Sequence, residues 1–157
     1  MTLPLIGEAA PTFSLTNQHG QTISLKDYKN TANVVLYFYP KALTPGCTTQ
    51  ACSIRDHKQQ FADLDTVVFG VSTDPIPKLV KFTEKKELNF DLLSDEDHHV
   101  AESYGVWGPK KFMGREFLGT KRVTFIIGKD GKLKHIIEKV NTKTHHDEVL
   151  EYIKANL

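Results

Sequence analysis

The chain has 157 residues, 39% of them hydrophobic and 25% charged, and its formal net charge is +1. This balance is typical of a soluble globular protein and excludes a disordered chain and a membrane-spanning protein. The lysines are scattered among carboxylates, so a basic groove for nucleic acid is not expected. The length suits a single domain over residues 1–157, which can bury a core without help from disulfides or metals.

Two short strands are predicted near the N-terminus, over residues 12–15 and 22–25, around a turn at 17–20. The segment before them lacks the basic region and the long apolar run of a secretory signal, and the first lysine is Lys26. We therefore expect a cytoplasmic protein. Thiols are kept reduced in that compartment, which favours redox chemistry or metal binding over a structural disulfide for closely spaced cysteines.

The middle of the chain predicts two crossover units. Residues 33–40 and 66–74 are apolar almost without interruption and rich in β-branched and aromatic side chains, which is typical of buried parallel strands. Apolar residues recur at helical spacing over 47–64, so we expect one helix to connect these strands. A second helix is predicted over 75–88, followed by a short strand at 90–93.

The C-terminal part predicts a short helix over 98–104 and a hairpin over 121–140, whose turn contains Asp-Gly. Between these elements, Trp107 is interpreted as a packed loop anchor. A final helix is predicted after Thr144, a candidate N-cap. Its apolar stripe consists of Val149, Leu150, Ile153 and Leu157.

The order of these elements is strand, helix, strand, helix, and then a hairpin and a last helix. This order is that of a thioredoxin-like α/β sandwich. We therefore predict a thioredoxin-like α/β fold with a central mixed β-sheet flanked by helices and an extra N-terminal β-hairpin.

The stretch PKALTPGCTTQAC, residues 40–52, holds both cysteines of the chain. Pro45 and Gly46 interrupt the preceding strand and place Cys47 in the first turn of the following helix. The unpaired backbone N–H groups and the helix dipole favour a thiolate at that position. Thr44 can bring its hydroxyl close to the sulfur or cap the helix, and its spacing alone leaves both roles open.

Cys52 follows Cys47 by five positions. On an ideal helix such residues are rotated by about 140° and their Cα atoms lie about 8.7 Å apart. Because a disulfide needs Cα atoms within about 7 Å, the two cysteines cannot pair while the helix is intact. A disulfide between them would require the first turns to unwind. Arg122 stands at the start of a strand, and from its position alone we interpret it as a solvated arginine.

Pro40, Thr44 and Cys47 form the pattern P-x-x-x-T-x-x-C, with Cys52 after it, and this pattern resembles the active-site signature of the peroxiredoxins. The segments YFYPKA, VFGVSTD, FDLLSDEDH, GVWG and KRVTFII extend the likeness. Together they resemble the bacterioferritin comigratory protein subfamily, also called peroxiredoxin Q, from residue 10 to residue 153.

This resemblance implies an antioxidant oxidoreductase, a thiol-dependent peroxidase that reduces hydrogen peroxide and organic hydroperoxides. Cys47 would be the peroxidatic cysteine and would become a sulfenic acid. Cys52 would resolve it as an intramolecular disulfide, which thioredoxin or a similar dithiol protein would reduce. Thr44 would hydrogen-bond thiolate and peroxide, Pro40 would shape and shield the pocket, and Arg122 would stabilise the developing charge. The resemblance also implies a monomer, and we expect no cofactor, metal, membrane or nucleic acid.

Two alternatives stay open. Cys52 could be a spectator, with an external thiol resolving the sulfenic acid, or the chain could be a non-enzymatic redox sensor or metal-binding module. The adjacent histidines at 98–99 and 145–146 point about 100° apart on a helix, so we interpret them as surface or capping residues rather than a chelating pair. The acids at 95–97 are interpreted as favouring a helix start.

Overall fold

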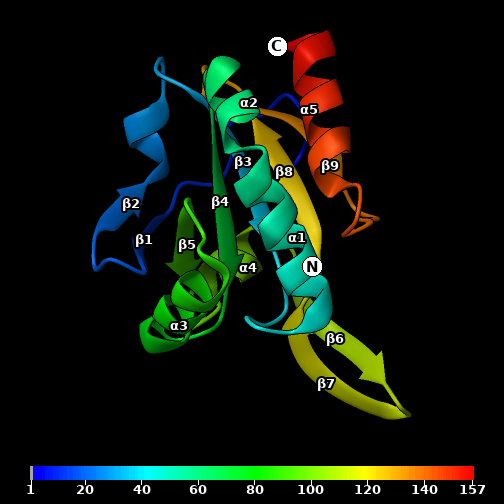
Figure 1. The fold of residues 1–157 in the computed structure, drawn as a ribbon. Coiled ribbons are helices and arrows are strands. Elements are labelled where there is room, and N and C mark those ends of the chain that lie inside the picture. Colours follow the sequence, from blue (N-terminus) through cyan, green and yellow to red (C-terminus); the bar gives the residue numbers. More distant parts are fainter. Residues whose placement is uncertain (1) are drawn as a thin grey trace.

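The computed structural model describes residues 2–157, with the exception of the side chain of Phe112. Seven strands form one mixed sheet in the order β2-β1-β5-β4-β3-β8-β9, and a second sheet of two strands projects from one end of the molecule (Figure 1). The strands of the large sheet are β1 (Ser14–Asn17), β2 (Thr22–Ser24), β3 (Asn33–Phe38), β4 (Thr66–Ser72), β5 (Asp91–Ser94), β8 (Val123–Ile127) and β9 (Leu133–Ile137). The predicted mixed sheet with an added N-terminal hairpin is confirmed.

β3 is an interior strand of this sheet, and every one of its residues is buried. It pairs in parallel with β4 and antiparallel with β8. Because side chains alternate along a strand, Val35 and Tyr37 enter the core on one face, whereas Leu36 and Phe38 enter the core on the other. The sequence of this strand is apolar almost without interruption because the side chains on both of its faces are buried.

Helices cover both faces of the sheet. Those on one face pack through apolar side chains such as Ala51, Leu79 and Val149, and the opposite face is covered by the N-terminal segment and a short helix around Val100. The first face carries α1 (Pro45–Asp56), α2 (Lys58–Asp63), α3 (Ile76–Lys86) and α5 (His145–Asn156). The second carries α4 (His99–Ser103) and the 3-10 helix η1 (Leu25–Tyr28).

The prediction of one helix over 47–64 is wrong, because the segment forms α1 and α2 with a break at His57. The His57 ring nitrogen Nδ1 lies 2.7 Å from the carbonyl oxygen of Ser53 and donates to it. That carbonyl would accept the backbone N–H of His57 in a continuous helix. The backbone N–H bonds instead to the carbonyl of Ile54, at 3.2 Å, so the helical ladder is interrupted without proline or glycine.

The region read as a loop around Trp107 is a hairpin of β6 (Trp107–Phe112) and β7 (Arg115–Thr120). Met113 and Gly114, which connect the strands, both have positive φ, at 51° and 79°. Two such residues in succession form a turn that suits a twisted hairpin, but methionine is rare at positive φ, so this turn could not be predicted from residue type. Trp107 still anchors the segment, because its ring stacks on His98 with centroids 4.0 Å apart.

The C-terminal predictions are confirmed with two corrections. β8 and β9 form the expected hairpin, and α5 begins after Thr144. However, the buried stripe of α5 ends at Ile153, because Leu157 is 45% exposed. Within residues 2–157, no side-chain hydrogen bond from Thr144 caps the helix, although Thr144 occupies the N-cap position. No helix of this described range is both long and apolar enough to cross a membrane.

Gly70 of β4 lies opposite Tyr37 of β3, and a Cβ atom there would stand 2.9 Å from the Tyr37 hydroxyl oxygen. Tyr37 and the neighbouring Tyr39 are each 1% exposed, so neither ring can move aside. We therefore expect Gly70→Ala to lower the free energy of unfolding, measured by urea denaturation, by about 1–3 kcal/mol. Gly108→Ala is the matched control, because its nearest neighbour, Lys121 Cε, lies 4.0 Å from the added atom. Equal stability of the two variants would contradict this account of the packing.

Candidate functional site

Cys47 lies in the first turn of α1, at the end of the loop that follows β3. Thr44 is the N-cap residue in extended geometry, and Pro45 opens the helix, a position where its missing N–H costs nothing. The thiol faces the core between helix and sheet, and Cys47 is only 2% exposed. The predicted position of Cys47 in the first turn of a helix is therefore confirmed, and the sulfur there is shielded from solvent.

Arg122, just before β8, reaches this sulfur. Its Nη2 atom donates to Cys47 Sγ at 3.3 Å, and its Nη1 atom donates to Gln50 Oε1 at 2.7 Å. The interpretation of Arg122 as a solvated arginine is thus wrong, because the side chain is half-buried and engaged at both ends of its guanidinium. A permanent positive charge beside Cys47 favours negative charge on the sulfur.

Thr44 directly precedes α1, and Pro40 lies four residues earlier in the loop after β3. The Thr44 hydroxyl donates to the carbonyl of Lys41 at 2.8 Å. Among the described residues it makes neither a capping bond to α1 nor a hydrogen bond to the sulfur, so neither of the two interactions that its spacing left open is formed in this structure. Pro40 and Thr44 line a cleft together with Trp107 and Leu118, and neither Cys47 nor Arg122 is among its lining residues.

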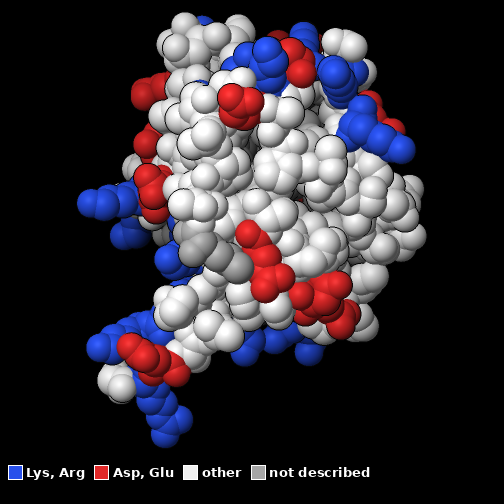
Figure 2. All heavy atoms as spheres, turned by 180° about the vertical axis from the view of Figure 1, so that it is seen from behind, with Lys and Arg blue, Asp and Glu red and all other residues white. Residues whose placement is uncertain are grey.

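This cleft combines apolar and positively charged groups. Lys110 also lines it, and the Lys110 ammonium donates to the carbonyl of Thr120 at 2.9 Å. Burial lowers the pKa of Lys110, and the nearby charge of Arg122 lowers it further. Figure 2 shows the projecting β6–β7 hairpin, at the lower left, as a place where Lys and Arg side chains gather. The cleft and the adjoining hairpin therefore present positive charge beside apolar side chains.

Cys52 lies on the same helix as Cys47 but is only half-buried, and both residues are free thiols. Cys47 belongs to the buried stripe of α1 with Gln50, Ala51 and Ile54, whereas Cys52 is outside that stripe. The structure thus contains the intact helix in which the two sulfurs were predicted to be held apart.

A buried polar network extends from Arg122 away from the cleft. Gln50 Nε2 lies 3.3 Å from His145 Nδ1, and His145 Nε2 lies 2.8 Å from Thr124 Oγ1. Gln50, His145 and Thr124 are all 0% exposed. The interpretation of His145 as a surface or capping residue is therefore wrong. Gln50 could have been found from its helical spacing from Cys47, and His145 from its place four residues before Val149 on the apolar stripe of α5.

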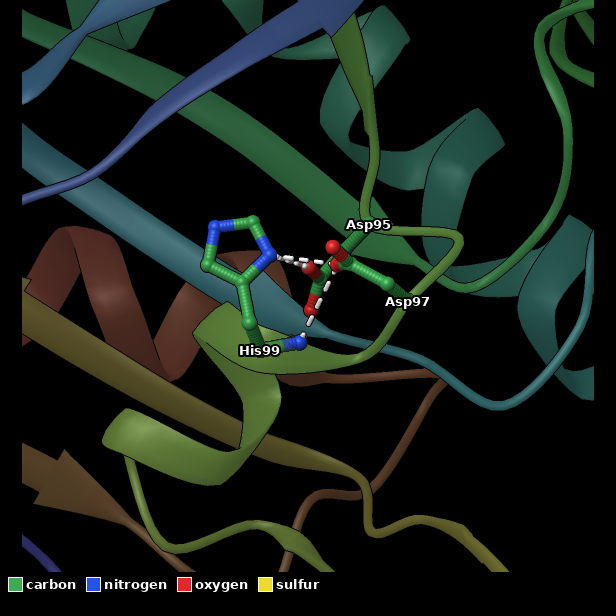
Figure 3. Close-up of side chains that lie close together, drawn as sticks. All are labelled: Asp95, Asp97 and His99. Atoms are coloured by element: carbon green, nitrogen blue, oxygen red, sulfur yellow. Dashed lines mark hydrogen bonds and ion pairs between the residues drawn. The ribbon is translucent and has the colours of Figure 1, made fainter.

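Asp95, Asp97 and His99 form a separate cluster at the start of α4, shown in Figure 3. Buried Asp95 accepts the backbone N–H groups of Val100 at 3.2 Å and Ala101 at 2.8 Å. Exposed Asp97 pairs with the ring of His99, and this contact lowers the pKa of Asp97 and raises that of His99. The predicted role of these acids at a helix start is confirmed. α4, which this cluster caps, packs on the face of the sheet opposite the one that Cys47 contacts.

The model of the AhpC/TSA family matches residues 6–136. The putative peroxiredoxin bcp of Haemophilus influenzae is 50% identical over 150 residues, with 96% of each chain covered. The chain belongs to the peroxiredoxins of the AhpC/TSA family. It is therefore an enzyme, a thiol-dependent peroxidase, and the resemblance seen in its sequence is confirmed.

Solved structures agree with this assignment of the peroxiredoxin. A cysteine-to-serine mutant of Xylella fastidiosa PrxQ superposes with a TM-score of 0.92 at 30% identity, covering 99% of this chain and 98% of the other. The bacterioferritin comigratory protein of Xanthomonas campestris gives a TM-score of 0.87 at 28% identity, with 94% and 98% covered. The predicted thioredoxin-like fold is thus confirmed.

The buried imidazole makes the stability of this peroxiredoxin depend on pH. Burial lowers the pKa of His145 to about 3, and the charges of His146 and Arg122 act in the same direction. A histidine of the unfolded chain titrates near 6.5, so between these values the unfolded state binds the additional proton. The contribution of His145 is therefore complete above about pH 6.5 and falls by up to about 1.4 kcal/mol per pH unit as the pH decreases.

Urea denaturation at pH 7.0, 5.5 and 4.5 measures this effect. The free energy of unfolding of the wild type should fall more steeply with decreasing pH than that of His145→Asn, whose side chain does not titrate. Parallel profiles for the two proteins would show that another group determines the acid sensitivity.

Proposed function

We propose that Cys47 is the peroxidatic cysteine of this enzyme. Its thiolate attacks the terminal oxygen of a hydroperoxide, the O–O bond breaks, and the hydroxyl is transferred to the sulfur. The remaining alkoxide takes up a proton and leaves as an alcohol, or as water when the substrate is hydrogen peroxide. The observation that carries the proposal is the Arg122 guanidinium, 3.3 Å from a shielded sulfur at a helix N-terminus.

Arg122 contributes in two ways in this proposal. Its charge favours the thiolate, and its donors stabilise negative charge as it moves from sulfur to the leaving oxygen. Thr44 assists by turning its hydroxyl from the Lys41 carbonyl towards the peroxide. Pro40 shields the reacting atoms from water on the same side.

Cys52 then resolves the sulfenic acid. Its thiol condenses with the Cys47 sulfenic acid, which forms the disulfide and releases water. Because both residues lie in α1, at least the first turns of this helix unwind in that step. A dithiol protein such as thioredoxin returns two electrons by thiol–disulfide exchange and completes the cycle.

The substrates are hydrogen peroxide and organic hydroperoxides. The X. campestris relative was studied for alkyl peroxide reduction, and the apolar wall formed by Trp107 and Leu118 suits the organic part of such a substrate. We further infer that residues 1–157 act as one domain, since both helical layers pack on a shared sheet. The family resemblance supports a monomer. The cytoplasm suits two cysteines that must return to the reduced state in each cycle.

The test is peptide mapping by mass spectrometry after one equivalent of hydrogen peroxide is added to the reduced protein. We expect a loss of two hydrogens and a linked peptide containing Cys47 and Cys52. The Cys52→Ser variant should instead gain one oxygen on Cys47 and lose thioredoxin-driven turnover. Undiminished turnover in this variant would make Cys52 a spectator, and an unmodified wild type would remove the assignment of Cys47.

A further inference from the structure

We propose that His145 is a positioning residue for peroxide reduction, because it holds Gln50 in the amide orientation that keeps Arg122 at the Cys47 sulfur. The inference deepens the proposed function, and it rests on Cys47 being the nucleophile. His145 itself touches neither the sulfur nor the cleft lining.

The chemistry of the donors fixes the orientation of each group. A guanidinium has donors only, so the Gln50 atom 2.7 Å from Arg122 must be the amide oxygen. The Gln50 amide nitrogen, also a donor, then faces His145 Nδ1 at 3.3 Å, and Nδ1 must accept. His145 therefore carries its proton on Nε2, which donates to the hydroxyl oxygen of Thr124 at 2.8 Å.

The chain of hydrogen bonds begins and ends on the same segment, at Arg122 just before β8 and at Thr124 within it. Arg122 and Thr124 are two residues apart, so their side chains leave the β8 segment on the same side. Between them, Gln50 comes from α1 and His145 from α5. The hydrogen bonds thus connect β8, α1, α5 and β8 again, and each bond limits the movement of the next group.

Burial makes the network depend on one tautomer of His145 and one orientation of the Gln50 amide. Gln50, His145 and Thr124 are fully enclosed, so water does not compete for their polar atoms. The ring of His145 also packs edge-on against Tyr37, with centroids 5.6 Å apart. If Nδ1 carried the proton, it would meet the Gln50 amide nitrogen, donor against donor. The amide would then rotate and turn its nitrogen towards Arg122, which would lose its acceptor.

A purely structural role for His145 would affect stability alone, and three variants separate the two possibilities. His145→Leu removes the acceptor of Gln50. His145→Asn keeps one, because its amide oxygen occupies the place of Nδ1. Val149→Ala shortens another fully buried side chain of α5, one that makes no hydrogen bond, and is the matched control for lost packing.

The measured quantity is the second-order rate constant of Cys47 oxidation by hydrogen peroxide, from quenched samples and mass spectrometry. We expect a decrease of about tenfold or more in His145→Leu, with recovery to within about threefold in His145→Asn and no change in Val149→Ala. A wild-type rate in His145→Leu, or an equal loss in Val149→Ala, would overturn the inference.

Nitrogen NMR of the wild type provides a second test that needs no variant to fold. The expected result is a proton on His145 Nε2 at pH 7, and a proton on Nδ1 would overturn the inference whatever the kinetics. Its failure is distinguishable from that of the proposed function. A wild type whose Cys47 does not react with peroxide refutes both, whereas a reactive wild type with an unaffected His145→Leu refutes only the role of His145.

Discussion

Replacement of Cys47 by serine is expected to abolish hydroperoxide reduction. A serine hydroxyl is almost entirely protonated at neutral pH and cannot accept the hydroxyl group of a peroxide as sulfur does. The turnover of hydrogen peroxide, coupled to a thiol reductant, should fall to the rate without enzyme. The fold should persist, because the substitution exchanges atoms of similar size in one buried contact.

Cys52→Ser is the control for this result. It also removes one thiol, but we expect one fast peroxide-dependent oxidation of Cys47 to remain in it, followed by arrest of thioredoxin-driven cycling. Full peroxidase activity of Cys47→Ser would place the nucleophile elsewhere and would refute the proposed mechanism.

Replacement of Arg122 by methionine should cause the second large loss. The variant keeps most of the side-chain volume but removes the donors to Cys47 Sγ and Gln50 Oε1. Removal of one preorganised donor from a site where charge develops costs about 100- to 1000-fold in rate. We therefore expect kcat/KM for hydrogen peroxide to fall by about that factor.

Two further variants test whether position or charge matters. Arg122→Lys keeps the charge but has no fork of donors to contact sulfur and Gln50 together, so its activity should be intermediate. Arg115→Met removes an exposed arginine on β7 and should retain wild-type activity. A loss of less than about threefold in Arg122→Met would contradict a direct role of the guanidinium.

The core of the fold could be predicted because its signals are local. β3, β4 and β8 are short apolar runs, and their composition alone distinguishes strands buried on both faces. The break at His57 and the hairpin around Gly114 could not be predicted in this way. The first depends on one side chain competing for a backbone carbonyl, and the second on a residue that rarely adopts positive φ.

The same distinction between local and long-range signals applies to the residues of the site. Cys47 and its helix start are specified by neighbouring residues, and the family resemblance added Arg122. The partnership of Gln50 with His145 joins residues 95 positions apart. The apolar stripe of α5 is compatible with either His145 or His146 on its buried side, so the periodicity alone does not show which histidine meets Gln50. The tertiary packing decides between them.

The break at His57 limits how far a change at Cys47 can spread. α2 begins beyond it and is held to the core by Phe61, which is 1% exposed. Unwinding that starts at the first turn of α1 can therefore end before α2, and the sheet keeps its cover on that side. Oxidation would alter the outline of the molecule only around α1. A reductant that binds this altered surface would recognise the oxidised form by its shape before any sulfur atoms react.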